Sequence, residues 1–215
     1  MGLRILTATF VLALGTGVAQ PLPELRTEPV TGGSVFTVKN SASQPVTAFL
    51  IELVNYPGSY YSLWQDEAAS VLIAPGAEKR IPVANMTVGA VPDYVKLQAA
   101  LFADGSSAGV PEKITQMIER RRHVLETVHE LISRLEKAKA ASAGKAAVVA
   151  DWKQWSDSLQ PARRANPSAQ ATINQNAARS VIGDAVSWLD SHSPEETLSR
   201  LQEMERALAA SKPKL

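Results

Sequence analysis

The sequence predicts an α+β protein, with an N-terminal antiparallel β-sandwich, a long helix and a small C-terminal helical region. Residues 34–110 carry the sandwich pattern, because short runs of β-branched and aromatic residues such as SVFTVK (34–39) alternate with turns rich in Gly and Pro. From Pro111 onward the apolar residues recur every three or four positions, which is the spacing of one face of an α-helix. This change of period divides the chain.

The strand pattern also indicates how the two regions pack. Strands are expected at 34–39, 46–54, 60–64, 71–74, 78–83 and 94–103. In the second of these, Phe49, Leu50 and Ile51 are consecutive and apolar, so both faces of the strand are apolar. Such a strand is normally covered on both faces. We expect the opposite sheet to cover one face and the long helix to cover the other.

Residues 111–140 predict one long amphipathic helix packed on the sandwich. Its apolar stripe has a three-four spacing and includes Ile114, Met117, Arg121, Val124, Val128, Leu131, Leu135 and Ala138. Arg121 is the one charged residue in that stripe. A cation at a buried position must extend its charge to solvent or meet a buried carboxylate or carbonyl oxygen. We expect one of these outcomes for Arg121.

Residues 141–215 predict a group of shorter helices. Trp152 and Trp155 share one helical face, Trp188 belongs to a later helix, and all three have the spacing of core residues. The tetrapeptide SPEE (193–196) combines a capping serine, a proline suited to the first helical turn and a glutamate that can close a capping box. An antiparallel bundle is the expected arrangement.

Residues 1–19 predict a secretory signal peptide. A basic residue precedes the charge-free run ILTATFVLAL (5–14), and small residues lead up to Ala19. An uncleaved membrane anchor is the alternative, but a span needs about 20 apolar residues and Pro21 ends this run early. We therefore expect cleavage after Ala19, a linker at 20–33, and a mature protein in the periplasm or outside the cell, without a transmembrane span.

The composition excludes several classes of function. The chain has no cysteine, so disulfides, thiolate catalysis and cysteine-ligated metal centres are excluded. It has 22 basic and 21 acidic side chains, and the signal peptide contains one of the basic ones and no acidic one. A neutral mature chain gives no electrostatic reason to expect nucleic-acid binding. His123 and His129 lie six positions apart on the helix and diverge, so neither a metal site nor a cofactor is expected.

Residues 105–109 (GSSAG) match the G-x-S-x-G pattern of a hydrolase nucleophile elbow, with Ser107 as the nucleophile. In a hydrolase of that kind the helix starts directly after the serine, and later strands bring an acid and a histidine. Here Pro111 comes four positions later and the strand pattern has already ended. The preferred interpretation is a turn built on Asp104-Gly105, and a hydrolase using Ser107 stays the least favoured hypothesis.

Two groups of residues are candidates for binding. Tyr56, Tyr60, Tyr61 and Trp64 surround a Pro-Gly turn, and aromatic loops of this kind either bind sugars and partners or cover the end of a core. Arg120, Arg121 and Arg122 form a basic cluster that suits an acidic or phosphorylated partner. The alternative for the arginines is an ordinary charged helix face, because Arg122 has an i, i+4 partner in Glu126.

Three segments carry a resemblance: TVKNSASQPVTAFLIEL, LIAPGAEKRIPV and YVKLQAALFADGSSAGVPEKITQMIERRR. Together they resemble uncharacterised exported bacterial proteins in which an immunoglobulin-like β-sandwich ends in a strand, a DG(S/T) turn and a long Arg-rich helix. The resemblance covers about residues 30–140, implies the immunoglobulin-like fold, and brings no activity or catalytic residue. That pattern has a capping Asp or Asn before the proline. Val110 stands there, so the cap is expected from Ser106 or Ser107.

The sequence thus predicts an exported, non-catalytic interaction or scaffolding protein, with a protein partner or a cell-envelope polymer as its ligand. Carbohydrate or cell-wall polymer binding through the aromatic loop is the alternative. The missing catalytic pattern, the export segment and the long helix are the observations behind this prediction.

Overall fold

The computed structural model describes residues 20–55, 60–66, 72–84 and 94–211. The predicted signal peptide and Tyr56 lie outside the described residues. The strands are β1 (Glu24–Val30), β2 (Gly33–Lys39), β3 (Val46–Leu53), β4 (Ser62–Asp66), β5 (Glu78–Ala84), β6 (Val95–Phe102) and β7 (Ser107–Gly109). The helices are α1 (Pro111–Ala140), α2 (Lys145–Ser158), α3 (Gln170–Ser191) and α4 (Pro194–Ala210). The predicted order of sheets first and helices second is confirmed.

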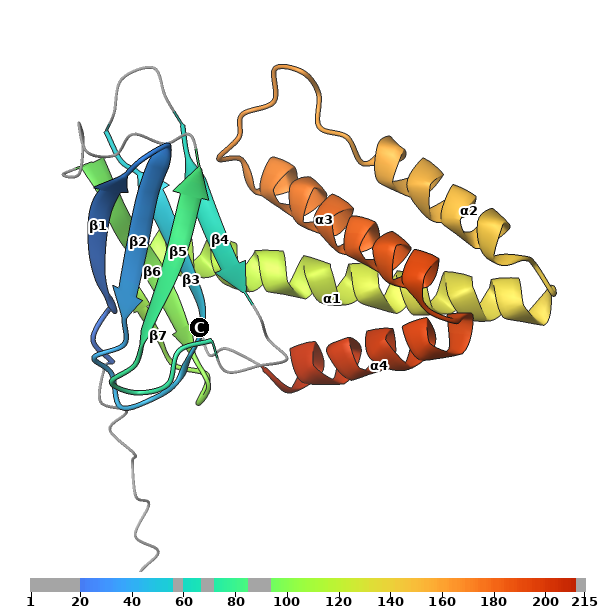
Figure 1. Ribbon diagram of the computed structural model, residues 1–215, viewed down its shortest axis with the longest axis horizontal. Helices are drawn as coiled ribbons and strands as arrows, with labels where there is room; N and C mark the ends of the chain where they lie inside the picture. Colours follow the sequence, from blue (N-terminus) through green and yellow to red (C-terminus); the bar gives the residue numbers. More distant parts are fainter. Residues whose placement is uncertain (1–19, 56–59, 67–71, 85–93, 212–215) are drawn as a thin grey trace, which may run out of the picture.

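The strands form two antiparallel sheets that face each other (Figure 1). One sheet has the order β1-β2-β5 and the other the order β4-β3-β6-β7. Phe36 and Val38 of the first sheet pack against Phe49, Ile51 and their neighbours in the second, and all four are fully buried. This shared apolar layer holds the two sheets together, because each sheet has one apolar face to remove from water.

The expected linker at 20–33 contains a strand that the sequence analysis missed. β1 pairs with β2 along its whole length, from Glu24 opposite Lys39 to Val30 opposite Gly33. The strand was not predicted because β1 contains Glu, Arg and Pro, which are uncommon in central strands. β1 is an edge strand with alternating exposure, which is where such residues are tolerated.

Two further expectations about the strands need correction. Of the strand predicted at 71–74, the described residues 72–74 do not form a strand, and Ile73 makes a single bridge to Val46. The segment after β6, expected to be a turn leading to the helix, contains a short seventh strand. The chain turns at Asp104 and Gly105, whose φ is 82°, and returns along β6 as β7.

Strand β3 is covered on both faces, as its double apolar pattern predicted. Phe49 and Ile51 point between the sheets. Ala48 and Leu50 point outward and lie under Met117 of α1. The prediction that α1 packs on the sheets is confirmed only for its first turns. From Val124 onward the helix leaves the sheets and packs against the other helices.

Helix α1 therefore belongs to two cores. Figure 1 shows it running out from the sheets, with α3 and α4 on either side of it and α2 lying on the outer side of α3. The bundle core contains Leu131, Trp152, Ile182, Leu189 and Leu201, all fully buried. Trp152 is thus a core residue as predicted, whereas Trp155 and Trp188 are only partly buried and pack at its margin.

Helix α4 begins with the capping box that the SPEE tetrapeptide predicted. The backbone N–H of Glu196 donates to the Ser193 hydroxyl at 3.2 Å, and the Glu196 carboxylate accepts from the Ser193 N–H at 2.9 Å. The carboxylate also accepts from the Ser193 hydroxyl at 2.8 Å. The bonds that it accepts, from the Ser193 backbone N–H first and then from the hydroxyl, lower the pKa of Glu196. Helix α1 has no equivalent. Val110 is the N-cap residue, and among the described residues no side chain accepts a capping hydrogen bond from the first turn of α1. The expectation that Ser106 or Ser107 caps this helix is therefore wrong. Ser106 instead hydrogen-bonds Asp104.

The approach to α1 depends on Gly109. Its φ is 117°, and a Cβ atom added there would lie 2.2 Å from the backbone oxygen of Gln98. The glycine lets β7 pass close to β6 and lets Val110 donate to the same Gln98 oxygen at 2.8 Å. Both glycines of the GSSAG segment thus have structural roles.

We predict that Gly109→Ala destabilises the protein by about 2 kcal/mol or more, because a side chain at this φ is strained and clashes with backbone. Gly183→Ala is the matched control. Gly183 lies within α3 and has open space around its Cα, so alanine should stabilise by about 0.5–1 kcal/mol. Denaturant unfolding of both variants tests this, and equal effects would contradict the role given to Gly109.

Candidate partner-binding surface on helix α1

The three consecutive arginines of α1 have three different environments. Successive residues of an α-helix point about 100° apart, so a run of three cannot form one patch. Arg121 is buried, Arg120 lies at the edge of the sheet, and Arg122 points to solvent; their side chains are 4%, 18% and 58% exposed. Only Arg122 is therefore available for a partner.

Arg121 meets a buried carboxylate, as one of its two predicted outcomes required. Its Nε and one terminal nitrogen donate to the two carboxylate oxygens of Asp66, at 3.1 and 2.7 Å. The same terminal nitrogen that donates to Asp66 at 2.7 Å also donates to the hydroxyl of Thr47, at 3.4 Å. Thr47 is the extra residue of a β-bulge in β3, and the bulge turns its side chain toward the helix.

Arg120 lies beside the same carboxylate. Its guanidinium is 5.7 Å from the ring centre of Trp64 and 3.8 Å from Asp66. Burial lowers the pKa of Arg120 and the nearby Asp66 carboxylate opposes that change, while Arg121 adds to it. Arg120 remains a cation that packs on an aromatic ring at the sheet edge.

A second ion pair ties the beginning of α1 to the sheet. Lys113 lies 2.9 Å from Glu52 of β3, and their side chains are only 17% and 8% exposed. Two buried carboxylates of the four-stranded sheet thus meet cations from α1. Neither Glu52 nor Asp66 was selected from the sequence. Glu52 lies within the strand expected to be covered on both faces, which is a signal that could have found it, whereas no local pattern marks Asp66 as buried.

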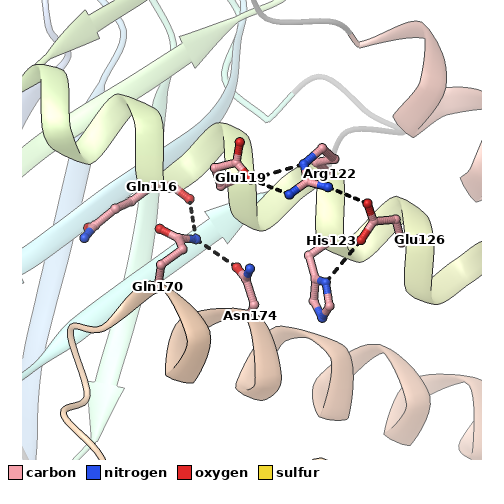
Figure 2. Close-up of polar contacts among 7 residues, drawn as sticks. All are labelled: Gln116, Glu119, Arg122, His123, Glu126, Gln170 and Asn174. Carbon is pink, nitrogen blue, oxygen red and sulfur yellow. Dashed lines mark hydrogen bonds and ion pairs between the residues drawn. The ribbon is translucent and has the colours of Figure 1, made fainter.

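Arg122 forms the exposed part of the arginine cluster. It contacts Glu119 and Glu126, one turn before and one turn after it, both at 2.6 Å (Figure 2). The predicted i, i+4 pair with Glu126 is confirmed. The hydrogen bonds that Arg122 donates to Glu119 first, and the charges of both carboxylates, raise the pKa of Arg122. His123 shares Glu126, at 3.3 Å.

Beside this charged surface, α1 and the end of α4 enclose an apolar groove of about 280 Å³. It is lined by Ile118, Arg121, Arg122, Leu125, Leu208, Ala209 and Ser211. Its walls come from segments more than 80 positions apart, so the sequence analysis had no means of finding it. Small-molecule sites usually have volumes of about 300–1,000 Å³. A groove just below that range suits one or two side chains of a partner.

A larger groove of about 390 Å³ lies between α1 and the first half of α2. Charged side chains in its lining already form ion pairs with one another: Arg134 contacts Glu130 at 2.8 Å and Asp151 at 3.0 Å. The same guanidinium lies 4.7 Å from the ring centre of Trp155. These contacts join α1 to α2, so we interpret this groove as part of the bundle packing.

On the side of α1 that faces α3, polar side chains join the two helices (Figure 2). Gln170 donates to the backbone oxygen of Gln116 at 3.3 Å and to Asn174 at 2.8 Å. Gln116 donates to the backbone of Ser168 at 3.4 Å, while its side-chain oxygen is buried and has no partner among the described residues. These contacts position the start of α3 on α1.

The structure separates the aromatic residues that the sequence grouped. Tyr61 points between the sheets, where its ring packs edge-on against Phe36 at 6.3 Å and burial raises its pKa. Trp64 points to the opposite face and packs under α1. Tyr60 is 42% exposed. The alternative interpretation, coverage of the core, thus applies to Tyr61.

Tyr94, which the sequence analysis did not select, is 39% exposed at the same end of the sheet. The N–H groups of Leu53 and Val54, where β3 ends, donate to the backbone oxygens of Tyr61 and Tyr94 at 3.0 and 2.7 Å. Tyr60 and Tyr94 thus flank the end of β3 on its two sides. Tyr94 is the first residue of the strand expected at 94–103, and the alternation places it on the exposed face with Lys96, a signal that could have selected it.

Ser107 is the first residue of β7 and pairs with Leu101 of β6. It lies in a strand, not at a sharp strand-to-helix turn, and the helix starts only after Gly109 and Val110. An acid and a histidine do follow Ser107 in hydrolase order, Asp184 and His192. Asp184 lies within helix α3 and His192 directly after its last residue, so neither lies on a strand. This arrangement differs from a nucleophile elbow with its acid and histidine.

The two helical histidines diverge as expected and contact different carboxylates. His129 lies 2.8 Å from Glu205 of α4, on the other side of α1 from His123 and its partner Glu126. In the part of the chain that the structure describes, no three His, Asp or Glu side chains come together as a metal site requires.

Comparisons with protein-family models, curated proteins and solved structures found no match to this chain. Within the described ranges, no helix combines the length and the apolar composition that a membrane crossing needs.

We predict that Asp66→Ala destabilises the protein by about 3–5 kcal/mol, because it leaves the charge of Arg121 buried without a partner. The control is Glu126→Ala, which removes an exposed partner of Arg122 and should destabilise the protein far less, because solvent screens an exposed pair. Adding Arg121→Met to Asp66→Ala should recover most of the loss, since an apolar pair needs no charge partner. Denaturant unfolding is the measurement, and equal costs for the two single variants would contradict the assignment.

Proposed function

We propose that this chain is an exported, non-catalytic interaction or scaffolding protein that holds a helical bundle at a fixed orientation to a pair of sheets. One observation carries the proposal. A single 30-residue helix, α1, is part of both cores, and the buried Arg121–Asp66 pair joins it to the sheet. A continuous helix across two packed regions resists bending between them, so their surfaces keep a constant spacing. That is the property a scaffold needs.

The two sheets support an immunoglobulin-like topology as part of this proposal. If β1 to β7 are named A, B, C, C′, E, F and G, the sheets become A-B-E and C′-C-F-G. Immunoglobulin-like domains place A, B and E in one sheet and C, F and G in the other, with C′ added beside C in some types. Such domains commonly bind other proteins, which agrees with an interaction role, although a fold alone does not define a function.

The predicted signal peptide provides the export part of the proposal. The chain has no cysteine, so its stability does not depend on disulfides. Burial of apolar side chains stabilises both cores, and this is compatible with a location on either side of a membrane.

The groove between α1 and α4 is the proposed contact surface. Ile118, Leu125 and Leu208 give it an aliphatic lining, to which the exposed Arg122 also contributes. The occupant that fits is an apolar side chain of a protein partner, inserted between two helices as in helix-in-groove recognition. The charged groups around Arg122 then lie at the polar rim that such interfaces have.

Position-specific photo-crosslinking in the compartment of the mature protein tests this proposal. A photoreactive residue at Arg122 or Ala209 should form an adduct with the same partner, and the same residue at Arg163 should not. Arg163 is an exposed position in the loop between α2 and α3. Ala209→Arg should reduce the adduct at Arg122 by about tenfold or more, because it places a charge in a proposed hot spot. Adducts at all three positions, or at none, would contradict the proposed surface.

Carbohydrate or cell-wall polymer binding is a second candidate function. Its proposed site now consists of Tyr60 and Tyr94 rather than the whole aromatic loop. The observation that favours it is the exposure of Tyr60 and Tyr94 on the two sides of the end of β3. Tyrosine rings at the end of a sheet provide flat apolar faces with a polar tip, which suits stacking on sugar rings.

A glycan array with the purified mature chain tests this second candidate. Binding should fall by about tenfold or more in Tyr60→Ala and in Tyr94→Ala, since each variant loses one stacking contact. Val30→Ala is the control, because Val30 is 46% exposed at the edge strand β1 and should leave binding unchanged. Failure of the wild-type chain to bind any glycan would remove this candidate.

A further inference from the structure

The first described residues of the chain are attached to the sheets. The side-chain oxygen of Gln20 accepts hydrogen bonds from both the backbone N–H and the hydroxyl of Ser43, each at 3.2 Å. Leu22 packs against the core between the sheets, and Pro23 is buried. Glu24 accepts a hydrogen bond from Ser41 at 2.7 Å, so two adjacent contacts hold this segment on the turn between β2 and β3.

We propose that Gln20 is a modification site: in the exported chain it becomes the N-terminal residue and is cyclised to pyroglutamate, with Ser43 holding its side-chain amide. The inference rests on the proposed export and on cleavage after Ala19. It goes beyond that proposal, because cleavage alone would leave a charged α-amine at the surface of the sheets.

The reaction needs only the groups of Gln20 itself. The free α-amine attacks the side-chain carbonyl carbon, Cδ, and a bond forms between the backbone nitrogen and Cδ. The bond from Cδ to Nε2 breaks, and Nε2 leaves as ammonia after taking up a proton from the attacking amine. The product is a five-membered lactam that keeps the original side-chain oxygen. No electrons are gained or lost, and no co-reactant is consumed.

Ser43 places two donors where negative charge develops. During the attack the charge builds up on the side-chain oxygen, and donors aimed at such an oxygen stabilise the transition state. Both Ser43 donors already contact that oxygen in the uncyclised residue. The lactam retains this oxygen as a hydrogen-bond acceptor.

Pro21 contributes a second constraint. The residue before a proline is restricted to extended backbone conformations, so Gln20 has fewer conformations to sample before it cyclises. The result of the modification is an N-terminus without a positive charge or a free amine. Such an end is closed to exopeptidases that require an amine.

Mass spectrometry of the N-terminal peptide from the exported protein tests the site. The expected peptide begins at residue 20 and is lighter by one ammonia than the peptide with free Gln20. A peptide that begins at Gln20 with an intact amine would overturn the inference and leave the export proposal standing. A peptide that begins at another residue would overturn the predicted cleavage site, and with it the inference.

The role of Ser43 is tested on the full mature chain, prepared as a fusion whose removal leaves Gln20 first. Cyclisation at neutral pH is followed by mass over time. Ser43→Ala should slow it by about two- to tenfold, the effect of losing one hydrogen bond. Ser41→Ala is the matched control, since it removes a hydroxyl from the same turn that contacts Glu24 instead, and it should leave the rate unchanged. Equal rates in the two variants would overturn the role of Ser43.

Discussion

The buried contact between Arg121 and Asp66 is the constraint on which the arrangement of this protein depends. Both side chains are almost completely removed from water, and the guanidinium makes two hydrogen bonds to the carboxylate. Each ion costs several kcal/mol to bury, and only the partner in the correct place compensates that cost. The pair therefore adds little net stability but strongly penalises any other placement of α1. We infer that it selects one position of the helix on the sheet.

Residues around this pair also help to fix the position of α1 on the sheet. Met117, Ile114 and Ile118 pack on the outer face of β3 and β6, and Lys113 reaches Glu52 near the start of the helix. The bulge at Thr47 adds a hydroxyl that contacts both the sheet and Arg121. Apolar contact alone would allow the helix to slide or rotate, because it is not directional. The polar contacts at two points along α1 remove that freedom.

Because α1 is fixed on the sheet and is also part of the bundle, it determines the position of the bundle relative to the sheets. Val124 to Leu135 continue the same helix into a second core with α3 and α4. The groove that we propose as the contact surface is lined by Arg122 of α1 and Leu208 of α4, among others. Its shape depends on the angle at which α1 leaves the sheet and on the docking of α4. The same contacts that orient the bundle therefore shape the proposed binding surface.

The sequence by itself determined the secondary structure that has a strong local period. The limits of α1, the doubly apolar strand β3, the capping box of α4 and the need of Arg121 for a partner all follow from residue spacing, because each depends on neighbours within one or two turns. Only the tertiary structure decided which acid meets Arg121, which tyrosines reach solvent, and that residues 24–30 form an edge strand. It also placed Leu208 beside Arg122. These outcomes depend on contacts between residues distant in the chain, and their free energies do not appear in any local pattern.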